Sequence, residues 1–199
     1  MIIEALKYPF KGERAANNII IGTLLIFASI FVLPIFILVG YFARTVNNSV
    51  NGKPAPEFKD YKGLFVDGIK LTAVFITYFA VLIALMLPIV VLGNVSDLLG
   101  LAAFWLYVPV FFLFYVGHPA LLYFYGRKLD FRDAFKVKEI VRKVVSWRYG
   151  KILLFLIGVN IAFTILQISL AFTILGLLLI PTTLFVELLV YTKLISGLD

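Results

Sequence analysis

The chain contains four long stretches without a single Asp, Glu, Lys or Arg residue. They cover residues 15–43, 71–96, 98–126 and 152–186. The hydrocarbon core of a bilayer is about 30 Å thick, and about 20 helical residues cross it. Because every stretch exceeds that length, the sequence predicts an all-α, polytopic transmembrane helix bundle that forms one integral membrane domain over residues 1–199. Composition agrees, since hydrophobic residues make up 62% of the chain and charged residues only 15%.

The number of spans depends on how the first and last stretches are divided. Residues 15–43 are long for one span and short for two, and Pro34 must disturb a continuous helix there. Pro34, Pro109 and Pro181 each precede an apolar segment, a tyrosine and a basic segment, which indicates three degenerate helical hairpins. This repeat predicts six spans, at approximately residues 14–31, 32–50, 65–92, 98–125, 147–170 and 173–195.

Positive charge is distributed unevenly among the predicted loops. Basic residues outnumber acidic ones in segments 44–70 and 127–151, whereas segment 93–100 carries only Asp97. Positively charged loops stay cytoplasmic, which places both basic loops and both termini inside, with the turns near Asp97 and Thr173 outside. Five spans with an outside N-terminus are the alternative, which the early basic residues disfavour. No signal-peptide cleavage site is recognisable, so the first span is expected to stay as an anchor in the cell membrane.

The chain offers few groups for catalysis. It contains no cysteine and a single histidine, His118, so neither thiol chemistry nor a metal site is expected. No nucleotide-binding loop, zinc-binding helix or Ser–His–Asp arrangement is present. We therefore predict a protein that is not an enzyme, has no catalytic residues and uses no cofactor. The net charge of +7 follows from the membrane topology, so no nucleic-acid partner is expected.

Glu187 is the only carboxylate expected in the interior of a span. A charge at that depth must pair, face water or protein, or be protonated. Its possible partners are Arg44, Lys193 and His118. The residue is interpreted either as a neutralised or paired helix–helix contact or as a proton or cation site.

Further polar residues lie within the predicted spans. Asn160, Thr164 and Gln167 recur at the spacing of one helix face. They are interpreted as hydrogen bonds between helices, with a polar cavity as the alternative. His118 is interpreted as a hydrogen-bonded interior residue or a helix break.

Two segments are expected at the cytoplasmic membrane surface. Asp67 and Lys70 lie three residues apart and can pair on one helix face, either as a site at the cytoplasmic mouth or as a structural ion pair beside a Gly68 that permits close helix packing. Residues 131–149 form the clearest amphipathic segment, which we predict to lie flat in the interface. Its lipid-facing polar surface comprises Arg132, Lys136, Arg142, Lys143 and Trp147. This surface either anchors the loop or recruits anionic lipid headgroups or a cytoplasmic protein partner.

Four short strings of residues carry a resemblance to a known family. They are residues 6–12 (LKYPFKG), 40–44 (GYFAR), 56–60 (PEFKD) and 63–70 (GLFVDGIK). Together they resemble DUF 4013, an archaeal integral-membrane family of unknown function. The resemblance is clear over about residues 1–75 and is limited to hydropathy beyond them. It implies an archaeal multi-pass protein and carries over no catalytic residues.

Two alternative functions fit such a chain. The first is a non-enzymatic membrane scaffold or accessory or assembly subunit with a basic cytoplasmic face. The alternative is a small transporter or lipid-handling protein with a polar cavity near Glu187, and a membrane enzyme is a distant third.

Overall fold

The protein is described by a computed structural model that covers residues 2–198, and these residues form helices and connecting turns. Six α-helices are long and two are short, and three 3₁₀ turns join them. In chain order the elements are α1 (Ile2–Lys7), η1 (Tyr8–Phe10), α2 (Ala15–Ala28), η2 (Ser29–Phe31), α3 (Leu33–Val50), α4 (Tyr61–Val95), α5 (Asp97–Gly126), η3 (Asp133–Phe135), α6 (Val137–Val144), α7 (Trp147–Ala171) and α8 (Ile174–Ser196).

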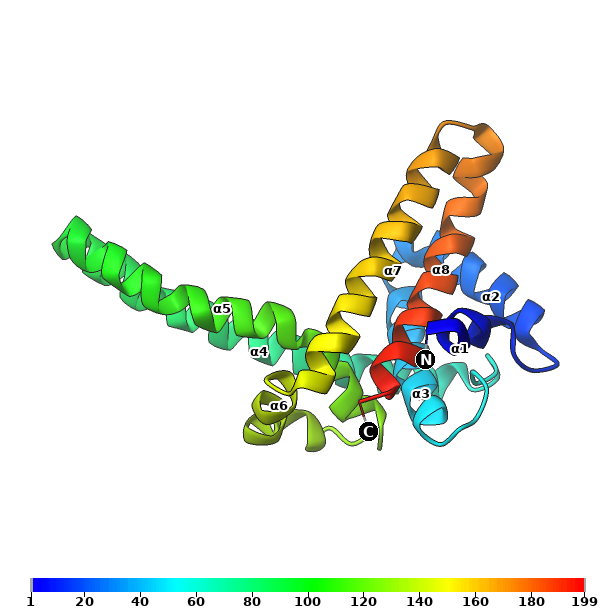
Figure 1. The fold of residues 1–199 in the computed structure, drawn as a ribbon, viewed down its shortest axis with the longest axis horizontal. Helices are drawn as coiled ribbons and strands as arrows, with labels where there is room; N and C mark the ends of the chain where they lie inside the picture. The colour runs from blue at the N-terminus through cyan, green and yellow to red at the C-terminus, as the bar shows by residue number, and fades with distance from the viewer. Residues whose placement is uncertain (1, 199) are drawn as a thin grey trace.

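Two helical hairpins dominate the molecule and diverge from a common base (Figure 1). One consists of α4 and α5, which are separated only by Ser96, and the other consists of α7 and α8. Both turns lie where the sequence predicts them, near Asp97 and Thr173. The hydroxyl of Thr173 accepts a hydrogen bond from the Gly176 amide at 2.9 Å and caps α8. All four helices are long and apolar enough to cross a membrane.

The first uncharged stretch contains a break, as predicted, but it does not form two full spans. Helix α2 ends at Ala28, Val32 adopts a positive φ of 60°, and Pro34 lies in the first turn of α3. With 14 residues, α2 is about 21 Å long, which is shorter than the hydrocarbon core. Segments Ile2–Phe10 and Ala15–Phe31 meet at 84° and qualify as a span only as a bent pair. The structure thus supports four or five spans, and six are not confirmed.

The amphipathic segment 131–149 is also divided. Its regular part is α6, whose eight residues end at Val144, because Ser146 caps the next helix through the Tyr149 amide. Helix α7 therefore begins at Trp147, within the segment predicted to lie flat. Of the apolar face, Ile140 is buried whereas Val145 is exposed.

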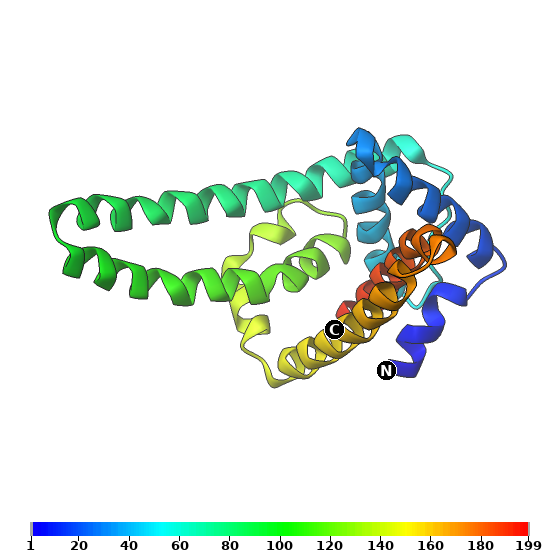
Figure 2. The same ribbon diagram turned by 90° about the horizontal axis from the view of Figure 1, so that it is seen from above.

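The base of the molecule is where the hairpins join. Helix α3 packs against α4, α5 and α8, and Figure 2 shows it standing beside the start of α4. The tightest crossing joins α3 and α4: a Cβ atom added to Gly68 would lie 1.7 Å from the Phe36 carbonyl oxygen. Only glycine permits such an approach of two backbones, so the prediction that Gly68 allows close helix packing is confirmed. Next to this crossing, Tyr41 stacks on Phe58 with ring centroids 3.9 Å apart.

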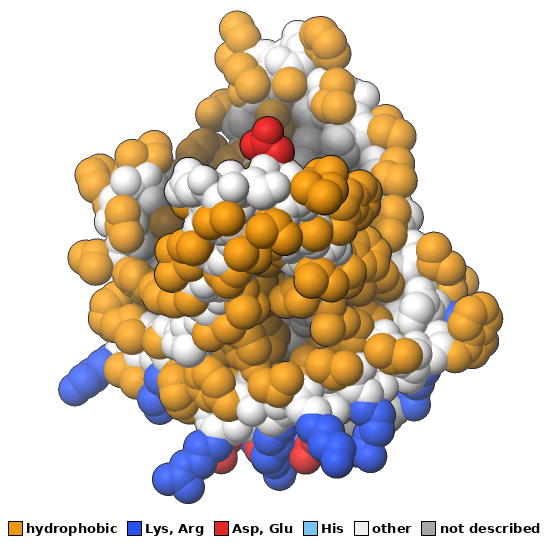
Figure 3. Space-filling view, turned by 90° about the vertical axis from the view of Figure 1, so that its left-hand side faces the viewer, with side chains coloured by type: hydrophobic (Ala, Val, Ile, Leu, Met, Phe, Trp, Pro, Cys, Tyr) orange, Lys and Arg blue, Asp and Glu red, His pale blue; other side chains and the backbone are white. Residues whose placement is uncertain are grey.

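The face of the molecule drawn in Figure 3 divides into a basic edge and a largely apolar region above it. In Figure 3, Lys and Arg side chains gather along the lower edge, the side on which α6 lies in Figure 1, and hydrophobic side chains cover most of the face above. Such a division is typical of a protein whose base lies at a membrane surface and whose hairpins enter the bilayer.

Candidate functional site

Most of the predicted polar residues fall into three separate clusters. One surrounds Arg44 at the junction of α3, α4 and α5, a second surrounds Glu187 on the α7–α8 hairpin, and a third lies around α6 at the base.

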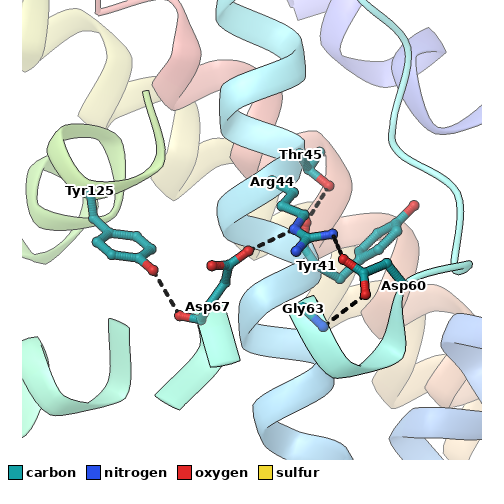
Figure 4. Close-up of polar contacts among 7 residues, drawn as sticks. All are labelled: Tyr41, Arg44, Thr45, Asp60, Gly63, Asp67 and Tyr125. Carbon is teal, nitrogen blue, oxygen red and sulfur yellow. Dashed lines mark hydrogen bonds and ion pairs between the residues drawn. The ribbon is translucent and has the colours of Figure 1, made fainter. Parts of the chain in front are cut away.

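Arg44 holds the α3–α4 crossing together (Figure 4). Its Nε donates to Oδ2 of Asp67 at 2.7 Å, and its Nη1 donates to Oδ2 of Asp60 at 3.1 Å. The Tyr125 hydroxyl on α5 donates to the backbone oxygen of Asp67 at 3.0 Å. Asp60 also caps α4, and its hydrogen bond from the Gly63 amide, together with the Arg44 guanidinium, holds the pKa of the Asp60 carboxyl below its ordinary value. The Arg44 guanidinium therefore links α3 to α4, and the Tyr125 hydroxyl joins α5 to the same cluster through the Asp67 backbone.

This arrangement corrects two predictions. Asp67 does not pair with Lys70: its ion-pair partner is Arg44, and Lys70 is exposed. Arg44 in turn does not contact Glu187. Helical spacing places Asp67 and Lys70 on one face of α4. However, α3 packs against that region of α4, and the guanidinium of its Arg44, which can donate several hydrogen bonds at once, binds Asp67 in place of Lys70. With Asp67 only 13% exposed, the pair is a structural contact between helices.

Glu187 is held by two amides from the neighbouring helix. Asn160 Nδ2 donates to its Oε1 at 3.0 Å, and Gln167 Nε2 donates to its Oε2 at 2.9 Å. The predicted partners Arg44, Lys193 and His118 are therefore wrong, whereas Asn160 and Gln167 do form hydrogen bonds between helices. Among the described residues no cation pairs with Glu187. Glu187 is half-buried and Asn160 is exposed, so the cluster opens onto the surface of the hairpin.

His118 is hydrogen-bonded, as predicted, but it is exposed instead of interior. Its Nε2 lies 3.0 Å from the Tyr191 hydroxyl on α8, and its Nδ1 lies 2.6 Å from the backbone oxygen of Tyr115. The residue thus links α5 to α8. In the described residues no group of three or more His, Cys, Asp or Glu side chains could hold a metal ion.

Asp133 organises the cluster around α6, although it was not among the predicted site residues. It is only 4% exposed and accepts from Lys136 Nζ at 2.6 Å and from Arg127 Nη2 at 3.2 Å. The bond from Lys136, followed by that from Arg127, holds the pKa of the Asp133 carboxyl below its ordinary value, and Asp133 raises the pKa of Lys136. Lys136 is therefore engaged in an internal contact, although it was predicted as part of a lipid surface.

The other residues of the predicted lipid surface are exposed or half-buried. Arg132 and Arg142 are exposed, and Lys143 is half-buried with its Nζ 5.9 Å from the centre of the Tyr123 ring. Trp147 is 77% exposed at the start of α7, with Lys151 Nζ 5.5 Å from its ring centre. An exposed tryptophan at the end of a span is typical of the headgroup region.

Comparison with known proteins gives one match. The model of a family described as Protein of unknown function (DUF4013) matches residues 23–180. No curated protein and no solved structure matches the chain. The match extends well beyond residue 75, where the resemblance in sequence was limited to hydropathy, and it leaves out the opening residues 6–12. The archaeal source stays a prediction. Because the match covers most of the chain, the protein belongs to the DUF4013 family.

Proposed function

We propose that this protein is a non-enzymatic membrane scaffold or accessory subunit, and that its α7–α8 hairpin binds a transmembrane helix of a partner protein. The observation that carries the proposal is the cluster of Glu187, Asn160 and Gln167. It places a carboxylate inside a span, at the surface of the hairpin, with amides as its partners.

Bilayer energetics explains why this cluster favours a partner. A charged side chain near the middle of a transmembrane helix costs about 3 kcal/mol, and such residues usually face protein or water and pair. Two amide donors satisfy only part of the acceptor capacity of a carboxylate. A partner helix that carries a Lys, an Arg or another strong donor at the same depth would supply the missing contacts.

The packing of the hairpins agrees with an assembly role. Helices α5 and α7 each pack mainly against the other helix of their own hairpin, whereas α4 and α8 also pack against α3 near the base, and contacts between the hairpins are confined to that region. Large apolar side chains along both hairpins are consequently exposed; examples are Ile76, Trp105, Leu106, Leu154 and Ile165. In a membrane, lipid or other transmembrane helices cover such faces.

The basic edge suggests the orientation of the assembly. We place it on the cytoplasmic side of the cell membrane, with the hairpin tips outside, because Lys and Arg gather at the base (Figure 3). In that orientation the base is free to contact cytoplasmic partners while the hairpins contact membrane partners.

The substitution Glu187→Gln tests this function. A tagged protein extracted in polymer-bounded native membrane discs is expected to carry a transmembrane protein in fixed stoichiometry. Removing the charge should lower its yield about ten-fold, because hydrogen bonds to charged groups contribute about 1.5–3 kcal/mol. Quantitative mass spectrometry of the discs measures the yield.

The control is Asp97→Asn, which makes the same chemical change at the tip of the other hairpin and should leave the yield unchanged. The proposal fails if the parent protein is extracted alone or if both variants behave alike. It also fails if the reconstituted protein instead supports a proton or cation flux that Glu187→Gln abolishes, since that result would identify the alternative function, a small transporter.

A further inference from the structure

Helix α6 separates two hollows of opposite character at the base of the α4–α5 hairpin. On one side lies a polar hollow of about 330 Å³, lined among others by Arg127, Glu139, Arg142 and Lys143. On the other side lies a cavity of about 170 Å³ between α4, α5 and α6, whose lining is almost entirely apolar. One eight-residue helix thus contributes basic groups to one hollow and valines and an isoleucine to the other.

The polar hollow is suited to an anion. Three basic side chains face one carboxylate, that of Glu139. Among the described residues neither Arg142 nor Lys143 has an ion-pair partner, so both charges are available to a ligand. Ser146 also lines the hollow, but its hydroxyl already donates to the Lys143 backbone oxygen at 2.6 Å and accepts from the Tyr149 amide, so the basic side chains are the donors that face a ligand. Phosphate groups are bound by such combinations of guanidinium and ammonium donors.

The Arg127 side chain is held in place before any anion binds. Its Nη2 donates to the buried Asp133 at 3.2 Å, and its guanidinium carbon lies 4.7 Å from the centre of the Phe124 ring. The ion pair and the ring fix a side chain that would otherwise lose rotamer freedom on binding. The Asp133 cluster therefore gives the hollow a rigid wall.

The apolar cavity distinguishes a lipid from a soluble anion. Val137, Ile140, Val141 and Val144 of α6 line it together with apolar residues of the hairpin such as Phe114. The exposed Trp147, three residues beyond the end of α6, marks the headgroup depth of the bilayer. A phosphate in the polar hollow would thus sit at the membrane surface, with an apolar cavity on the membrane side of the same helix.

We propose that the hollow between the end of α5 and α6 binds the phosphate-bearing headgroup of an anionic membrane lipid, and that the apolar cavity beside α6 takes part of its tail. Arg142 and Lys143 bind the phosphate, and Arg127 forms the fixed wall of the site. This site is independent of Glu187 and of any partner helix.

Native mass spectrometry of the detergent-purified protein tests the site with defined lipids. Phosphatidylglycerol should bind about ten-fold more tightly than phosphatidylcholine, since basic groups at a membrane surface favour anionic lipid. The double variant Arg142→Gln/Lys143→Gln should lose this preference, whereas Arg142→Lys/Lys143→Arg should retain it. The matched control Lys138→Gln/Arg148→Gln removes the same charge from exposed positions outside the hollow and should bind like the parent.

Three results would overturn the proposal. The first is equal binding of the two lipids by the parent protein. The second is an equal loss of preference in the control variant, which would show attraction to net charge without a site. The third is binding of inorganic phosphate as tight as that of phosphatidylglycerol, which would make a soluble anion the ligand. Because neither Arg142 nor Lys143 forms an ion pair with another described residue, the variant is expected to keep the thermal stability of the parent.

Discussion

Replacement of Gly68 by alanine should lower the free energy of unfolding by about 3 kcal/mol, the upper part of the usual range for overpacking. The added Cβ atom would lie 1.7 Å from the Phe36 carbonyl oxygen, and a backbone atom has no rotamer by which to move away. Gly40→Ala should act alike, because its Cβ atom would meet the Leu64 oxygen at 1.8 Å. Unfolding by SDS in mixed micelles, followed by circular dichroism, measures the change.

Gly158→Ala is the matched control for these variants. Gly158 lies within α7, and a Cβ atom there meets nothing within 4 Å. Alanine is also the better helix former, so this variant should be as stable as the parent or slightly more stable. Equal midpoints for Gly68→Ala and Gly158→Ala would show that α3 and α4 do not cross at these glycines.

Asp67→Asn should have the second largest effect, a loss of about 2 kcal/mol of stability, because a hydrogen bond to a charged group is removed and Arg44 is left half-buried beside the exposed Asp60. A double-mutant cycle with Arg44→Gln, measured by the same unfolding assay, should give a coupling of about 1 kcal/mol or more.

Lys70→Gln provides the comparison for this pair. Lys70 is the partner that helical spacing predicts for Asp67, yet the structure leaves it exposed. We expect no coupling between Asp67 and Lys70 in the corresponding cycle. A coupling to Lys70 as large as that to Arg44 would contradict the observed packing of α3 on α4.

The sequence predicted well those features that depend on local composition. Uncharged stretches became helices, the turns lie near Asp97 and Thr173 as predicted, and Pro34 follows a real break. The span count was less predictable, since hydropathy does not show that α2 ends at Ala28, well short of a membrane thickness. Periodicity likewise identified a helical segment around α6 but not its end at Val144, which the cap at Ser146 decides.

The contacts of the polar residues could not be predicted in the same way. Helical period says which residues share a face, and it correctly grouped Asn160 with Gln167. It does not say which helix packs on that face or at what height. Arg44 was therefore named as one of three possible partners of Glu187, although it pairs with Asp67. Asp133 was missed because its burial arises from the return of segment 127–136 onto α5 and not from any local pattern.

Cysteine accessibility tests most directly whether the two hairpins cross the membrane from a basic cytoplasmic base. The chain contains no cysteine, so the label on a single-cysteine variant reports the accessibility of that one position. Asp97→Cys and Phe172→Cys at the hairpin tips should react with a membrane-impermeant maleimide on intact cells. Ile3→Cys and Lys138→Cys at the base should react only after permeabilisation. Labelling of position 3 from outside, or of tip and base from the same side, would contradict this architecture.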